Sequence, residues 1–199
     1  MLTLPKTKQL TRIAALTAAI LATGCGQQDE ETSESKSICG RTNDLQEVPE
    51  YDGTLGISIG FVAQHETPVG AILNAGGSPY CSGTLISENL FLTAGHCIPS
   101  GPDSVAFNYQ VGSEPELFEV TRVVERGRGL DYAILEVAGN PGDIYGFASL
   151  TGRSISRGET LVIIQHPQGT PKKVEVGTLS RVSGSRLSYS GLDTLGGSS

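Results

Sequence analysis

The chain contains three histidines, His65, His96 and His166, and each could act as a base in catalysis. A neutral imidazole, with a pKa of about 6.5, accepts a proton near neutral pH and can activate a serine hydroxyl, which alone is a poor nucleophile. One serine lies in a Gly-x-Ser-x-Gly pattern at residues 56–60, the spacing of a nucleophile elbow. That elbow needs a strand followed by a helix, whereas this stretch predicts a strand with no helix after it. We therefore interpret it as a chance match.

Two of the four cysteines, Cys81 and Cys97, flank a strand-like stretch. In an exported chain, where disulfides persist, we expect them to form a disulfide that closes a local loop. A metal site would combine His96 with Cys97 and would need a second ligand pair at finger-like spacing, which the sequence does not offer. No metal is therefore predicted. The sequence does not indicate a partner for Cys39.

Three motifs follow one another along the chain, and each centres on a residue type that takes part in serine catalysis. Residues 81–97 read Cys-Ser-Gly-Thr-Leu-Ile-Ser-Glu-Asn-Leu-Phe-Leu-Thr-Ala-Gly-His-Cys, and residues 130–135 read Leu-Asp-Tyr-Ala-Ile-Leu. Residues 193–199 read Asp-Thr-Leu-Gly-Gly-Ser-Ser. In this order the motifs resemble the histidine, aspartate and serine regions of the trypsin-like (chymotrypsin-fold) serine proteases, from about residue 54 onward. Residues 163–173 resemble the bacterial branch related to glutamyl endopeptidases.

The resemblance implies a role for each matching residue. His96 would be the general base, a buried Asp131 would orient it, and Ser199 would be the nucleophile. The backbone N–H groups of Gly197 and Ser199 would form the oxyanion hole, and glycine suits position 197 because that turn brings its backbone close to the substrate. The implied reaction is endopeptidase hydrolysis of a protein or peptide substrate through an acyl-enzyme, without a metal or organic cofactor.

Other residues of the same types are rejected by their positions. Ser198 lies one residue after Gly197, whereas the family pattern places the nucleophile two residues after the glycine. The remaining histidines are expected on the surface or in turns, and two aspartates in Gly/Pro-rich loops are expected to form turns; these four are His65, His166, Asp103 and Asp143. Asp193 stands where basic-specific members carry a pocket carboxylate, but Asp-Thr is also familiar here in the bacterial branch, so we infer no basic specificity.

Two features depart from the family pattern. Digestive members have an aspartate immediately before the nucleophile that pairs with a newly cut N-terminus. Ser198 stands in that place, so we do not expect activation by that ion pair. The family also continues beyond its nucleophile with strands that complete the second barrel, whereas the sequence stops at Ser199. We therefore expect a second barrel that is incomplete within this chain, and an inactive protein if residues 1–199 are produced alone.

The body of the chain predicts strands and no long helix. Short β-branched segments bounded by Gly, Pro, Asn and Asp indicate strands at residues 55–62, 69–73, 83–87, 104–109, 118–124, 160–165 and 174–182. This pattern is typical of an all-β protein. The resemblance makes the fold two antiparallel β-barrels, and a Gly/Pro-rich seam at residues 137–143 could divide them.

Residues 1–25 predict a signal peptide with a lipobox-like end. A basic start precedes an apolar run that is shorter than the about 20 residues of a membrane span. Residues 21–25, Leu-Ala-Thr-Gly-Cys, resemble the lipobox of bacterial lipoproteins, in which the cysteine, here Cys25, is lipidated. Residues 26–50 are acidic and poor in apolar residues, which predicts a disordered tether before a protease domain at residues 51–199.

Charge and targeting limit the partners. The chain has 21 acidic and 14 basic residues, a net charge of −7, and no basic run beyond its first dozen residues, which excludes a nucleic-acid binder. We expect an exported, monomeric lipoprotein of the bacterial cell envelope, at the outer membrane or the cell surface, which contacts a membrane only through lipid at Cys25. The alternative is a secreted protein. The alternative functions are a non-catalytic protease homologue acting as an exported binding module and a β-rich surface lipoprotein for adhesion.

Overall fold

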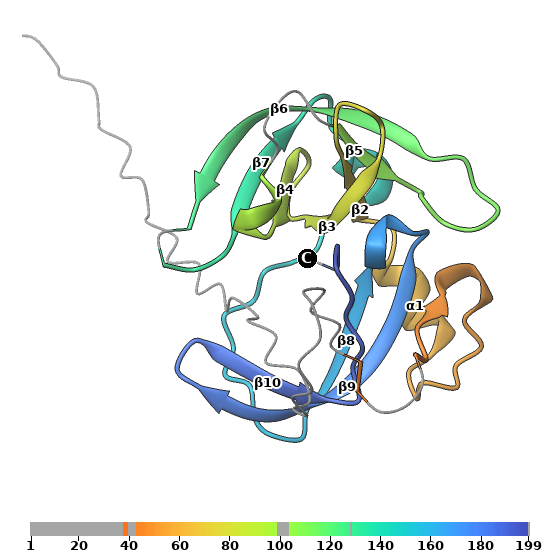
Figure 1. The fold of residues 1–199 in the computed structure, drawn as a ribbon, viewed down its shortest axis with the longest axis vertical. Coiled ribbons are helices and arrows are strands. Elements are labelled where there is room, and N and C mark those ends of the chain that lie inside the picture. Colours follow the sequence, from red (N-terminus) through yellow and green to blue (C-terminus); the bar gives the residue numbers. More distant parts are fainter. Residues whose placement is uncertain (1–37, 40–42, 99–103, 128, 199) are drawn as a thin grey trace, which may run out of the picture.

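A computed structural model describes residues 38–39, 43–98, 104–127 and 129–198 of the chain. These residues form two β units, one above the other in Figure 1. The upper unit is a closed antiparallel barrel in the order β2-β3-β4-β7-β6-β5. Its strands are β2 (Val69–Leu73), β3 (Pro79–Leu85), β4 (Leu90–Thr93), β5 (Ser104–Phe107), β6 (Glu116–Arg126) and β7 (Ala133–Val137).

Apolar side chains that alternate along the strands fill the barrel. In β7, Ala133, Leu135 and Val137 are buried while the residues between them are partly exposed, the period expected of a strand with one face toward a core. Phe91 and Phe107 meet edge to face in that core, with ring centroids 5.9 Å apart. The predicted all-β class is therefore confirmed.

The lower unit is a sheet of four strands built around a long central strand. β9 (Lys173–Ser183) pairs with β8 (Thr160–Gln165) along one edge. Along the other edge it pairs with β10 (Arg186–Ser190) and with the short β1 (Gln46–Glu47). All of these pairings are antiparallel, and within the described residues this sheet does not close into a barrel. The predicted seam at residues 137–143 lies too early, because residues after it still pack on the barrel. Tyr145 contacts the barrel core, and the Ala148 N–H donates to the Leu85 carbonyl at 2.8 Å. The connection to the second unit therefore lies between Ala148 and β8.

Five helical segments complete the described chain: η1 (Val48–Glu50), α1 (Ile59–His65), η2 (Gly95–Cys97), α2 (Gly142–Tyr145) and η3 (Pro167–Gly169). α1 lies beside β9 in Figure 1. Its one buried residue, Val62, packs with Tyr51 and Val174 in a small apolar cluster. In the part of the chain that the structure describes, no helix is long and apolar enough to cross a membrane.

The strand predicted at residues 55–62 is wrong, because turns and the start of α1 occupy that stretch. Ser58 is the N-cap of α1, and its Oγ accepts a hydrogen bond from the Phe61 N–H at 3.1 Å. A serine in this position satisfies a donor that the first helical turn leaves open. This local bond outweighs the apolar alternation from which the strand was predicted.

The tether predicted at residues 26–50 ends earlier than expected. Gln46 and Glu47 pair with Val174 and Lys173 of β9, and the Val48 N–H donates to the Lys172 carbonyl at 3.1 Å. An acidic segment can join a fold when its backbone completes the edge of a sheet, since strand pairing uses main-chain groups. The folded body therefore includes the last residues assigned to the tether.

Gly83 of β3 lies opposite Thr93 of β4, where the structure leaves no room for a side chain. A Cβ atom there would stand 2.3 Å from Phe91 Cε1 and 2.5 Å from the Leu92 carbonyl oxygen. We expect Gly83→Ala to lower the free energy of unfolding by about 1–3 kcal/mol because the buried Phe91 must move.

Gly60→Ala is the matched control for that substitution. Gly60 lies in α1, and no atom lies within 4 Å of the position that an alanine methyl group would take, so alanine should be neutral or stabilise by about 0.4–1 kcal/mol. Urea unfolding of both variants measures the two changes, and an unchanged midpoint for Gly83→Ala would contradict the crowding argument.

Candidate active site

Strand pairing brings His96 to Asp131. β4 and β7 are antiparallel neighbours in which Thr93 lies opposite Ala133. The chain continues from Thr93 into η2, which carries His96, and it enters β7 immediately after Asp131 and Tyr132. The two side chains therefore meet at one end of the barrel although 35 positions separate them in the sequence.

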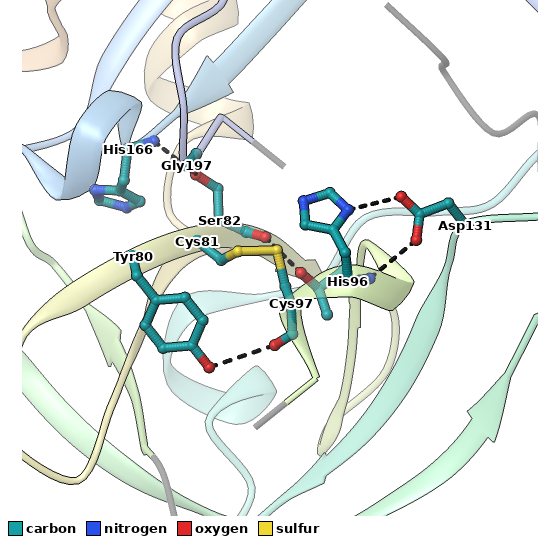
Figure 2. The surroundings of a disulfide bond; sticks show 9 residues. Tyr80, Cys81, Ser82, His96, Cys97, Asp131, His166 and Gly197 are labelled. Carbon is teal, nitrogen blue, oxygen red and sulfur yellow. Dashed lines mark hydrogen bonds and ion pairs between the residues drawn. A yellow bond between two sulfur atoms is a disulfide. The ribbon is translucent and has the colours of Figure 1, made fainter. Parts of the chain in front are cut away.

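Asp131 holds His96 through both carboxylate oxygens (Figure 2). Oδ2 lies 2.7 Å from Nδ1 of the imidazole, and Oδ1 accepts the His96 backbone N–H at 2.9 Å. The side-chain hydrogen bond from His96 lowers the pKa of Asp131 below its ordinary value, so the carboxylate is ionised near neutral pH. An ionised carboxylate only accepts hydrogen bonds, which places the proton of a neutral imidazole on Nδ1.

Asp131 is more exposed than expected, and Gly95 gives its carboxylate room. Asp131 was expected to be buried, but 41% of its side chain is exposed, because it precedes β7 at the open end of the barrel. Gly95 was not singled out, yet a Cβ atom there would lie 2.8 Å from Asp131 Oδ1. A glycine at this position lets the carboxylate approach the backbone of η2.

The predicted disulfide between Cys81 and Cys97 is confirmed. It joins β3 to the end of η2, next to His96, and both cysteines are buried in the barrel core. Tyr80 adds a weaker link, because its hydroxyl donates to the Cys97 carbonyl at 3.4 Å. The disulfide also removes Cys81 and Cys97 as metal ligands, although their sulfurs lie close to His96.

The segment after β10 passes between the two units toward β3 (Figure 1), where main-chain and side-chain bonds hold it. Ser82 Oγ donates to the Gly197 carbonyl at 2.6 Å, and the Gln168 N–H donates to the Gly196 carbonyl at 2.5 Å. Gly197 has a φ of +84°, which favours glycine. Its Cβ would lie 2.9 Å from the Tyr80 carbonyl oxygen, so the position has no room for a side chain.

Ser199 and Cys25 lie outside the described residues, as does Asp103. The structure therefore places the predicted base, its orienting carboxylate and one of the two oxyanion-hole residues, and these gather around β3 (Figure 2). The Ser198 hydroxyl is engaged within a tight turn, where its Oγ accepts the Leu195 N–H at 2.8 Å. This contact does not favour Ser198 as a second candidate nucleophile.

The other histidines and Asp143 lie apart from the His96–Asp131 pair. His65 is exposed at the end of α1 and stacks on Phe61, and Asp143 is exposed in α2. His166 lies in a turn as predicted, but it is fully buried. Burial and, to a smaller extent, the charge of Lys172 lower the pKa of His166 to about 3, so its ring stays neutral.

The Gly-x-Ser-x-Gly pattern at residues 56–60 lies at the start of α1. A helix does follow it, contrary to the prediction, but turns rather than a strand precede Ser58. The Ser58 hydroxyl serves as the cap of α1. The pattern is therefore a helix start and not a nucleophile elbow.

A group of three carboxylates lies where β9 and the segment after β10 meet, and the sequence did not predict that they lie together. Asp44, Glu175 and Asp193 each place an oxygen within 4.8 Å of the others, and Glu175 and Asp193 are buried. Asp193 Oδ1 accepts the Cys39 N–H at 2.6 Å. Carboxylate oxygens are ligands for hard cations. Burial above all raises the pKa of Glu175 and of Asp193, and the charge of Asp44 acts in the same direction. No short motif joins these residues, so sequence reasoning could not have grouped them.

A closed antiparallel barrel, a second antiparallel sheet and a His–Asp pair beside a glycine-rich segment define a protein of the trypsin-like class. A family model described as a trypsin-like peptidase domain matches residues 81–199. The match covers more than half of the chain, so the chain belongs to this family and the predicted family is confirmed. No curated protein matched the sequence. Membership of this family supports the function of a protease-like hydrolase, which acts on proteins or peptides.

Glu175 should make the stability of the protein depend on pH. Burial above all raises its carboxyl pKa from 4.5 to about 7, and the neighbouring Asp44 and Asp193 act in the same direction. Because the folded state holds this proton more tightly than the unfolded state, the free energy of unfolding falls as pH rises from about 4.5 to about 7. Glu175→Gln should remove this loss and stabilise the protein at pH 8 by about 1–3 kcal/mol.

Chemical denaturation at pH 5 and pH 8 measures this effect. Glu119→Gln, at an exposed position of β6, is the matched control and should keep the wild-type profile. The account fails if Glu175→Gln loses the same stability between the two pH values as the wild type.

Proposed function

We propose that this protein is a serine endopeptidase that cleaves peptide bonds through an acyl-enzyme. The observation that carries the proposal is the contact between His96 and Asp131, in which one carboxylate binds both the imidazole Nδ1 and the backbone N–H of the same residue. A carboxylate in this position fixes the tautomer of an imidazole and stabilises the imidazolium that forms during catalysis.

The resemblance to the family gives the roles of the three residues, and the contact between His96 and Asp131 supports two of them. With its proton on Nδ1, His96 has an unprotonated Nε2 on the other side of the ring, and this atom takes the proton of the Ser199 hydroxyl. The serine oxygen then attacks the substrate carbonyl, and the Nε2 proton passes to the leaving amine. The Gly197 and Ser199 N–H groups bind the negative oxygen of the tetrahedral intermediate.

The main alternative is a non-catalytic homologue that binds proteins. Two observations favour the enzyme. A binding module has no need of a carboxylate aligned on Nδ1, and no need of a glycine at position 95 that admits this carboxylate. We extend the proposal to the bacterial branch related to glutamyl endopeptidases, because residues 163–173 resemble that branch.

Substitution of the three residues tests the proposal. In the protein at its full natural length, Ser199→Ala, His96→Ala and Asp131→Asn should each lower kcat/KM for a peptide substrate by a factor on the order of 10³ or more. The triple variant should be little worse than the worst single one, because the residues act as one unit. Steady-state kinetics on folded protein supplies the measurement.

His65→Ala and Asp143→Asn are the controls, since they remove the same residue types from exposed positions in α1 and at α2. Both should keep wild-type kcat/KM. Retained activity in Ser199→Ala would mean that another residue is the nucleophile. A wild-type protein that binds peptides without cleaving them would favour the binding module.

We also propose that lipid on Cys25 anchors the protein to a membrane of the bacterial cell envelope. The lipobox-like residues 21–25 and the acidic stretch after them support this localisation. A clickable fatty acid supplied to expressing cells should label the wild type and Cys39→Ser but not Cys25→Ser. Labelling of all three proteins, or of none, would leave a secreted protein with an ordinary signal peptide as the better explanation.

A further inference from the structure

We propose that Ser82 is a positioning residue whose hydroxyl holds the oxyanion-hole backbone at Gly197 in its active orientation. The inference rests on the proposed function. It means that a strand of the barrel, β3, helps to shape the part of the site that lies in the segment after β10. Ser82 lies in β3, next to the disulfide cysteine Cys81, and only 5% of it is exposed.

Two bonds orient the peptide groups on either side of Gly197. The carbonyl of Gly196 accepts from the Gln168 N–H, and the carbonyl of Gly197 accepts from Ser82 Oγ. In a trans peptide the N–H points opposite to the carbonyl of the same plane. The Gln168 bond therefore sets the direction of the Gly197 N–H, and the Ser82 bond fixes the next plane. Together they hold the φ of +84° at Gly197.

The Ser82 hydroxyl is itself held in one orientation. Its oxygen accepts the His166 N–H at 2.8 Å, so its own proton is directed to the Gly197 carbonyl at 2.6 Å (Figure 2). His166 cannot shift easily, because it is fully buried and its ring stacks on Tyr109 at a centroid distance of 5.4 Å. One buried hydroxyl thus joins β3, the turn at His166 and the glycine segment.

This arrangement links the base and the oxyanion hole through neighbouring residues of one strand. Cys81 is bonded to Cys97, which follows His96, while Ser82 is bonded to Gly197. Oxyanion donors act only when they are aimed in advance at the position where charge develops. Removing the Ser82 hydroxyl leaves the Gly197 carbonyl and the His166 N–H without this partner, so the segment gains freedom to turn its N–H away.

The test compares two substrates that differ in one atom. The wild-type protein at its full natural length, Ser82→Ala and Ser82→Thr are assayed with an oxygen ester and the matched thionoester, whose sulfur accepts hydrogen bonds poorly. We expect Ser82→Ala to lower kcat for the oxygen ester about 10–100-fold with little change in KM, less than the ~10²–10³-fold loss of a direct donor. Its preference for the oxygen ester over the thionoester should fall by a similar factor. Ser82→Thr, which restores a hydroxyl, should recover this preference.

Thr93→Val is the matched control. It removes a buried hydroxyl bond that links β4 to β3, from Thr93 Oγ1 to the Ser82 carbonyl at 2.7 Å, and this bond does not involve the glycine segment. It should lose stability but keep the wild-type preference. Because both substrates are measured on one sample, the folded fraction cancels from the ratio.

The outcomes separate the two proposals. An unchanged substrate preference in Ser82→Ala, with an active wild type and an inactive Ser199→Ala, overturns the positioning role and leaves the proposed function intact. An equal loss of preference in Thr93→Val also overturns it, since the preference would then not depend on the particular bond from Ser82 to Gly197. A wild type that turns over neither substrate overturns the proposed function and this inference together.

Discussion

The antiparallel pairing of β4 with β7 is the constraint on which the rest of the site depends. Thr93 lies opposite Ala133, so the residues that follow one strand face those that precede the other. A shift of this register by one residue would turn the side chains of β7 to the opposite face and separate His96 from Asp131. The buried residues of β7 prevent that shift, because Leu135 and Val137 belong to the core. The packing of the barrel therefore sets the geometry of the His–Asp pair.

Two of the glycines near the site serve close approach rather than flexibility. Gly95 leaves room for the Asp131 carboxylate, and Gly197 leaves room for the Tyr80 carbonyl. Gly95 follows β4 in η2, whose Cys97 is fixed by the disulfide, and Gly197 lies against β3, where Ser82 holds its carbonyl. The candidate site is thus built by bringing backbone segments together, and the Asp131 carboxylate is held by the His96 backbone N–H as well as by the imidazole.

The sequence predicted those parts of the fold that depend on local pattern or on motifs. β2 and β8 were predicted with their observed bounds, and the disulfide was predicted from two cysteines that flank a strand-like stretch in an exported chain. Predictions failed where one local bond decided the structure, as the Ser58 cap did for α1. They also missed contacts between distant residues, such as that of Ser82 with Gly197, 115 positions apart. Neither partner has a spacing or composition that marks the other, so only the folded chain reveals the bond.

The helix that replaced the predicted strand also supports the turn beside the site. Glu66, the C-cap of α1, accepts Lys172 Nζ on its carboxylate at 2.6 Å and on its carbonyl at 2.7 Å. The Lys172 side chain is almost fully buried, and an unpaired charge there would cost about 3–5 kcal/mol. Lys172 follows the turn of His166 and Gln168, the residues that bind Ser82 and the Gly196 carbonyl. The ion pair between Lys172 and a capping residue of α1 therefore steadies the turn whose Gln168 N–H binds the Gly196 carbonyl, and it links the lower unit to the glycine segment beside β3.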